Sequence, residues 1–108
     1  MEAGYEVDVS TAAQEEARKI VDGLALDLGD GPSDRVNDRI RLAIRSLAAN
    51  PTRRTRVRYL IGRQFVYRRV LVGSYYCVIF TIDEDARRVE VVRVDSQRSG
   101  PATLDDLP

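Results

Sequence analysis

Apolar and polar residues alternate along positions 5–9, with the period of two that is typical of a strand with one buried face. Thr11 and Gln14, three positions apart, then have the form of a capping box, so the sequence predicts that a helix begins at this point. The apolar residues that follow recur at three- and four-residue spacings and form one stripe along that helix. They are Ala13, Ala17, Ile20, Val21, Leu24 and Leu28.

Residues 29–32 are turn formers and must end this first helix. Ser33 or Asp34 can cap a second helix, which we expect to end at Asn50, because the residue before a proline is driven out of the helical region. A second apolar stripe runs along it, so the two helices are expected to form an antiparallel hairpin. This stripe consists of Val36, Ile40, Ala43, Ile44 and Leu47.

Three strand-like runs follow a basic connector at residues 52–62, and short polar turns separate them. A strand, a helical hairpin and a three-stranded antiparallel meander make an α+β domain, with both helices on one face of the sheet and one core. The first strand should pair with the meander, either antiparallel beside its first strand or parallel beside its last. We expect one domain over residues 1–98 and a loosely held tail over residues 99–108. The three runs span residues 65–72, 75–82 and 88–94.

The composition is that of a soluble globular protein, because 44% of the residues are hydrophobic and 31% are charged. The sequence contains neither an apolar run long enough to span a membrane nor a signal peptide at its start, so we expect a cytoplasmic protein without membrane contacts. It has no histidine and one cysteine, which excludes an internal disulfide, histidine-based zinc sites and histidine-dependent catalysis. We therefore expect neither a metal nor a cofactor, and we expect Cys77 to be a small buried residue.

Positive charge is concentrated in the second half of a chain whose formal net charge is zero. Residues 53–98 contain eleven arginines and five acidic residues, a pattern expected where a protein meets phosphates or an acidic partner. Arg68 and Arg69 are neighbours on a strand, so their side chains should point to opposite faces. Arginines and tyrosines on one open sheet face would suit RNA, whereas the alternative is a solvated face that balances nearby acids. The residues that we expect on such a face are Arg68 or Arg69, Arg93, Arg98, Tyr67, and Tyr75 or Tyr76.

The order of these segments, together with several local strings, resembles the RelE/ParE superfamily of bacterial toxins from type II toxin–antitoxin systems. The most specific strings are YRRVLVGSYYCVIFTI at residues 67–82 and DEDARRVEVVRVDSQR at residues 83–98. SLAANP at residues 46–51 also resembles the end of the second helix in this family. The resemblance covers residues 5–98 and implies the α+β toxin fold. It also implies a cognate antitoxin protein as a partner.

The resemblance implies one of two activities. RelE-like members enter the decoding site of the ribosome and cleave messenger RNA without a metal, whereas ParE-like members lack the nuclease site and inhibit DNA gyrase. Our first hypothesis from the sequence is the RelE-like endoribonuclease, and the second is the ParE-like gyrase inhibitor. The third is a degenerate family member that only binds a partner.

The nuclease residues of the family match this chain unevenly. Arg68 stands at the first basic position after the tyrosine, but Val70 stands where a second basic residue is expected. Cys77 occupies the place of an arginine on the central strand, and Ser96 and Gln97 replace the usual basic pair near the end. The tyrosine or histidine expected in the C-terminal segment is absent, which leaves cations without an ordinary general base.

Under the nuclease hypothesis, Arg68 and Arg98 would be the catalytic residues and would contact the phosphate, with Arg98 serving one position later than in the family. Tyr67 or Tyr76 would stack on a base or position it. The other residues expected to bind RNA or another target are Arg53, Arg54, Arg56, Arg58, Arg69 and Gln97.

Overall fold

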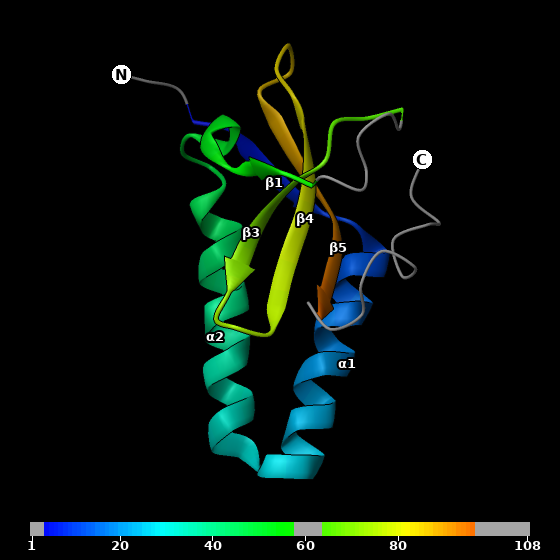
Figure 1. Ribbon diagram of the computed structural model, residues 1–108, viewed down its shortest axis with the longest axis vertical. Helices are drawn as coiled ribbons and strands as arrows, with labels where there is room; N and C mark the ends of the chain where they lie inside the picture. Colours follow the sequence, from blue (N-terminus) through cyan, green and yellow to red (C-terminus); the bar gives the residue numbers. More distant parts are fainter. Residues whose placement is uncertain (1–3, 58–63, 97–108) are drawn as a thin grey trace.

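The chain forms one strand, a pair of helices and four further strands in the computed structural model, which describes residues 4–57 and 64–96 (Figure 1). The predicted α+β order of strand, helical hairpin and meander is confirmed. The expected connector also contains a short 3₁₀ helix and a short strand that the sequence pattern did not predict. In chain order the elements are β1 (Glu6–Val9), α1 (Thr11–Leu28), α2 (Asp30–Ser46), η1 (Pro51–Arg53), β2 (Thr55–Arg56), β3 (Arg68–Val72), β4 (Tyr76–Asp83) and β5 (Arg88–Ser96).

All five strands belong to one sheet, in the order β1-β5-β4-β3-β2. The strand pairs β2/β3, β3/β4 and β4/β5 are antiparallel, whereas β1 lies parallel to β5, with Glu6 opposite Arg88 and Val9 opposite Val91. Of the two positions expected for the first strand, the structure therefore has the parallel one beside the last strand. The helical hairpin makes the long crossover that a parallel pair requires.

Helix α1 begins one residue earlier than the predicted capping box implies. Ser10 is the N-cap, with an extended backbone, and its Oγ accepts a hydrogen bond of 3.1 Å from the Ala13 N–H. The Ser10 N–H itself donates to the Val91 carbonyl at 2.9 Å. Ser10 thus ends the pairing with β5 and begins the helix, while Gln14 donates from its side chain to the Val9 carbonyl at 2.9 Å.

Both ends of α2 differ from the prediction. Gly29 alone links the helices, with a φ of 92° that favours glycine, so α2 begins at Asp30 and includes Pro32 in its first turn. Ser33 is therefore no cap; it is buried, and its hydroxyl donates to the Val21 carbonyl at 2.9 Å. The helix ends at Ser46 rather than at Asn50, which has a left-handed backbone with a φ of 53°.

The main core lies between the helical hairpin and one face of the sheet. Both predicted stripes contribute to it, and Ile20, Val36 and Ile44 pack against it from a half-buried position. Leu28, the last member of the first stripe, is 63% exposed, because the tip of the hairpin extends beyond the sheet (Figure 1). The buried residues of this core are Ala13, Ile40, Leu47, Val70, Val72, Val78, Phe80, Val89, Val91 and Val94.

A second buried cluster lies on the other face of the sheet, which we call the outer face. It contains Val57, Tyr67, Cys77 and Ile79, with Val92 packed against it. Because side chains alternate along a strand, Cys77 and Ile79 point away from the helices that cover their neighbours on β4. The residues expected to form one core with the helices do so in the main core, and the outer-face cluster is a second one that the sequence did not predict.

Candidate functional site

Arg68 and Arg69 lie on opposite faces of the sheet, as their adjacency predicts. Arg68 shares the helix-covered face with Val70 and Val72, and its Nη1 donates to the Arg54 carbonyl at 2.8 Å. This hydrogen bond links β3 to the backbone between η1 and β2. Arg69 alternates to the outer face, where it is half-buried.

The other predicted arginines gather at the β2 edge of the sheet. Arg56 is paired with Arg68 across β2 and β3, and Arg53 and Arg56 are exposed. Arg54 is half-buried, and its Nη2 donates to Ser46 Oγ, at the end of α2, at 3.2 Å. The predicted site residues Arg58, Gln97 and Arg98 lie outside the residues that the structure describes.

The structure does not bring the predicted tyrosines together on one open face. Tyr67 is only 2% exposed and lies in the outer-face cluster, with its ring edge-on to that of Phe65. Tyr76 packs against the main core on the opposite face, edge-on to Tyr75. Since a base needs an accessible ring to stack on, Tyr75, at 52% exposed, is the better placed of these tyrosines.

Cys77 is the residue on the central strand β4 that stands in place of the family's arginine. It is 8% exposed, pairs with Asp95 on β5, and is buried as predicted. Burial raises the pKa of its thiol to about 11, nearby Asp95 raises that pKa further, and Arg69 opposes the shift. The thiol is thus uncharged at neutral pH, so this position offers neither a cation nor a nucleophilic thiolate.

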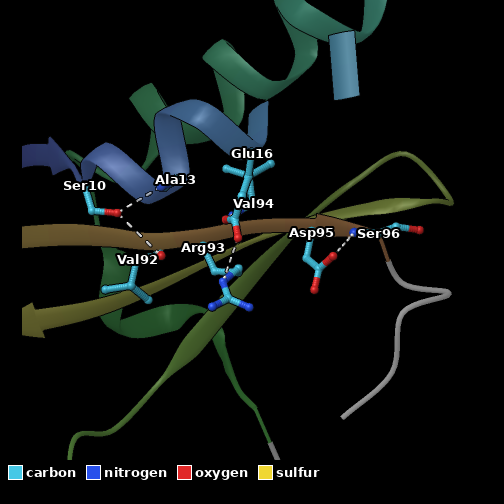
Figure 2. Close-up of polar contacts among 8 residues, drawn as sticks. All are labelled: Ser10, Ala13, Glu16, Val92, Arg93, Val94, Asp95 and Ser96. Carbon is cyan, nitrogen blue, oxygen red and sulfur yellow. Dashed lines mark hydrogen bonds and ion pairs between the residues drawn. The ribbon is translucent and has the colours of Figure 1, made fainter. Parts of the chain in front are cut away.

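Glu16 on α1 forms an ion pair with Arg93 on β5 (Figure 2). Its Oε2 lies 2.9 Å from Arg93 Nε, and its Oε1 accepts a hydrogen bond of 3.0 Å from the Val94 N–H. The side chain of Arg93 is 11% exposed and that of Glu16 is 30% exposed. The ion pair holds Arg93 Nε beside the Glu16 carboxylate, and the two terminal nitrogens of the guanidinium point away from that carboxylate (Figure 2). This arginine was expected on an open phosphate-binding face.

The sequence pattern did not single out Glu16. It immediately precedes Ala17 of the first apolar stripe, and a charged residue bordering a stripe looks like part of a solvated helix face. Only the parallel position of β1 reveals its role, because β1 stops at Val9 and leaves the following part of β5 without a strand on that side. The Glu16 carboxylate supplies an acceptor there.

The described residues contain no group of three or more histidine, cysteine, aspartate or glutamate side chains that could hold a metal ion. None of the helices formed by these residues is long and apolar enough to cross a membrane.

A family model described as the ParE toxin of the type II toxin–antitoxin system, parDE, matches residues 7–101. The chain belongs to the ParE toxin family. It is a toxin of a type II toxin–antitoxin system within the RelE/ParE superfamily, which confirms the resemblance seen in the sequence. No curated protein matches the chain.

Two solved structures share the fold of this ParE family member. The chromosomal ParDE toxin–antitoxin system from P. aeruginosa matches with a TM-score of 0.70 and 11% identity, over 85% of this chain and 95% of that one. The RelBE2 toxin–antitoxin complex from Mycobacterium tuberculosis matches with a TM-score of 0.55 and 22% identity, over 90% of this chain and 95% of that one. At these identities the likeness concerns the fold.

Replacing Glu16 by alanine should destabilise the protein, because Arg93 would keep its buried position without its ionic partner. Breaking a fully buried pair costs about 3–5 kcal/mol, and we expect about 2 kcal/mol here because Glu16 is partly exposed. Denaturant unfolding followed by circular dichroism measures the change. Glu15→Ala, at the exposed neighbouring position, is the control and should change the stability by no more than about 0.5 kcal/mol. Equal losses in both variants would contradict the role of Glu16.

The buried thiol should make part of the stability depend on pH. Its pKa is about 11 in the folded protein and near 9.0 in an unfolded chain, so its stabilising contribution is complete below pH 9 and is lost as the pH rises toward 11. The difference in unfolding free energy between the wild type and Cys77→Ala should shift accordingly between pH 8 and pH 11. Rapid alkylation of native Cys77 at pH 7 would contradict the neutral, buried thiol.

Proposed function

We propose that this chain is a ParE-like toxin that stops bacterial growth by binding DNA gyrase, and that it does not cleave RNA. The observation that carries the proposal is Cys77, a buried neutral thiol at the strand position where RNA-cleaving relatives are expected to have an arginine. Without that cation, the central strand has no group to stabilise the developing negative charge on a phosphate.

The neighbouring residues support binding rather than chemistry. Metal-free RNA cleavage needs a base for the 2′-hydroxyl as well as cations for the phosphate. The sequence has no histidine, Arg93 is paired with Glu16, and Arg68 donates to a backbone carbonyl on the other face of the sheet. A toxin with this arrangement is better suited to inhibit a protein than to catalyse a reaction.

One observation favours the alternative of a RelE-like nuclease. Arg53, Arg54 and Arg56 lie close together at the β2 edge, and arginines are well suited to ribosomal RNA phosphates. Binding to the ribosome alone would not cleave a message, so this cluster supports the alternative less strongly than Cys77 opposes it. A degenerate member that only binds its antitoxin is the remaining possibility, and it would not arrest growth.

Purified protein should inhibit supercoiling by purified gyrase and should leave messenger RNA intact on translating ribosomes. Expression without the antitoxin should arrest growth with an induced DNA-damage response and with continued translation. Supercoiling assays, primer extension on ribosome-bound messages and pulse labelling measure the three effects. Message cleavage with unaffected gyrase would overturn the proposal in favour of the nuclease. Normal growth with soluble expression would favour the degenerate member.

We further propose where the antitoxin binds. A groove of about 660 Å³ runs between β1 and the two helices, with Val7, Ile40 and Ile44 among its apolar residues. Arg18 and Arg41 also line it, and Arg45 lines the adjoining hollow of about 470 Å³. This apolar groove with arginines suits an amphipathic segment that carries acidic residues.

Arg41→Glu together with Arg45→Glu should weaken the complex with the antitoxin encoded beside this gene, because two attractive charges become repulsive. We expect roughly a tenfold loss of affinity or more, measured by calorimetry, with inhibition of gyrase unchanged. Arg35→Glu with Arg39→Glu makes the same change of charge on α2 at exposed residues that do not line the groove. Similar losses in both pairs of variants would indicate attraction to net charge and would contradict this site.

A further inference from the structure

The outer face of the sheet has a groove at the end that carries the β4–β5 turn. It has a volume of about 650 Å³ and is formed by β1, β4, β5 and the segment just before β3. Its carboxylates are Asp8, Asp83, Glu84 and Glu90, and we call it the acidic groove. It faces away from the helices and carries none of the contacts discussed for RNA cleavage.

The charge of the acidic groove is strongly negative for a chain of zero net charge. Arg88 is the one cation among the described residues that line it. The guanidinium of Arg88 is already engaged, at 2.5 Å from Glu6 Oε1 and 3.4 Å from Asp8 Oδ2. All four carboxylates of the groove belong to exposed residues. Such a surface repels nucleic acid phosphates and attracts cationic groups.

Two large apolar side chains form part of the same groove. Phe65 is 47% exposed and Val66 is 50% exposed, and both line the hollow beside half-buried Ile82. Adjacent exposed apolar residues next to one sign of charge are typical of a protein interaction site. The described residues contain no group of carboxylates that could hold a metal ion.

We propose that the acidic groove binds a segment of the toxin's protein target that carries lysine or arginine beside an apolar side chain. This inference rests on the proposed function, since it supplies the surface with which a gyrase-binding toxin holds its target. The cationic group of the segment lies among Asp8, Asp83 and Glu90, and the apolar side chain packs on Phe65 and Val66. The arginines at the β2 edge play no part in this contact.

The test compares Glu90→Lys combined with Phe65→Ser against Asp27→Lys combined with Leu42→Ser. Both pairs change the charge equally and remove one exposed apolar side chain, but Asp27 and Leu42 lie on the helices outside the acidic groove. Binding of each purified variant to purified gyrase is measured by calorimetry at low and high salt. Thermal unfolding verifies that all the variants fold.

We expect the groove variant to bind gyrase roughly tenfold more weakly or worse, and the control variant to bind within about twofold of the wild type. Wild-type binding should weaken as salt rises, and the groove variant should show a smaller dependence. Equal binding by the groove variant and the wild type would overturn the inference while leaving the proposed function intact.

A wild-type protein that does not bind gyrase would instead refute the proposed function. Growth arrest by the same variants then tests whether the acidic groove binds another protein target. Arrest that persists in the groove variant would overturn the inference. Arrest that is lost in the groove variant and kept in the control would support binding of another protein target through the acidic groove.

Discussion

The parallel pairing of β1 with β5 is the contact on which the rest of the structure depends. It joins the first strand of the chain to the last of the described strands, so the helical hairpin must cross over one face of the sheet. Val7 and Val9 then face the helices, while Glu6 and Asp8 face outward beside Arg88. One short strand thereby contributes both to the apolar groove near the helices and to the acidic groove on the outer face.

Specific hydrogen bonds also fix the point at which the pairing of β1 with β5 ends. Where β1 stops, Ser10 donates its backbone N–H to β5 and caps α1 with its side chain. One turn and a half further on, Glu16 accepts from the Val94 N–H and pairs with Arg93 (Figure 2). An unsatisfied N–H would otherwise remain in a partly buried position, which is costly. Ser10 and Glu16 therefore supply hydrogen-bonding groups to β5 where a neighbouring strand would otherwise supply them.

The elements of the fold were largely predictable, because their signals are local. Alternation predicted β1, strand-like runs between polar turns predicted β3, β4 and β5, and three- and four-residue spacing predicted the helices. Ile40 and Leu47 of the second stripe are buried. The predicted helix boundaries were wrong where tertiary contacts determine which residue caps or begins the helix. Ser10 rather than Thr11 is the cap because β5 fixes the backbone at Ser10, and Ser33 became buried because a single glycine suffices for the turn.

The candidate site was less predictable, because the number of charged residues along the sequence does not show on which face or edge of the sheet their side chains lie. Arginines of the basic half lie at the β2 edge, in the ion pair of Arg93 and over the Tyr5 ring, where Arg87 lies. Three acids of the same half line the acidic groove instead: Asp83, Glu84 and Glu90. The sequence suggested that Arg68 or Arg69 shares one open face with Tyr67 and with Tyr75 or Tyr76. The structure instead buries Tyr67 on the outer face and packs Tyr76 against the main core on the other face.

The placement of β5 between β1 and β4 also has a consequence during synthesis of the protein. The contact between Glu16 and Val94 spans 78 positions of the chain, and that between Ser10 and Val92 spans 82. A nascent chain cannot make these contacts until β5 has left the ribosome, and contacts of such long range slow folding. The helical hairpin can form early, but it then lacks the sheet that buries its apolar stripes. Neither groove is therefore complete before β5 has emerged, because β5 holds β1 beside the helices and supplies Arg88 and Glu90 to the acidic groove.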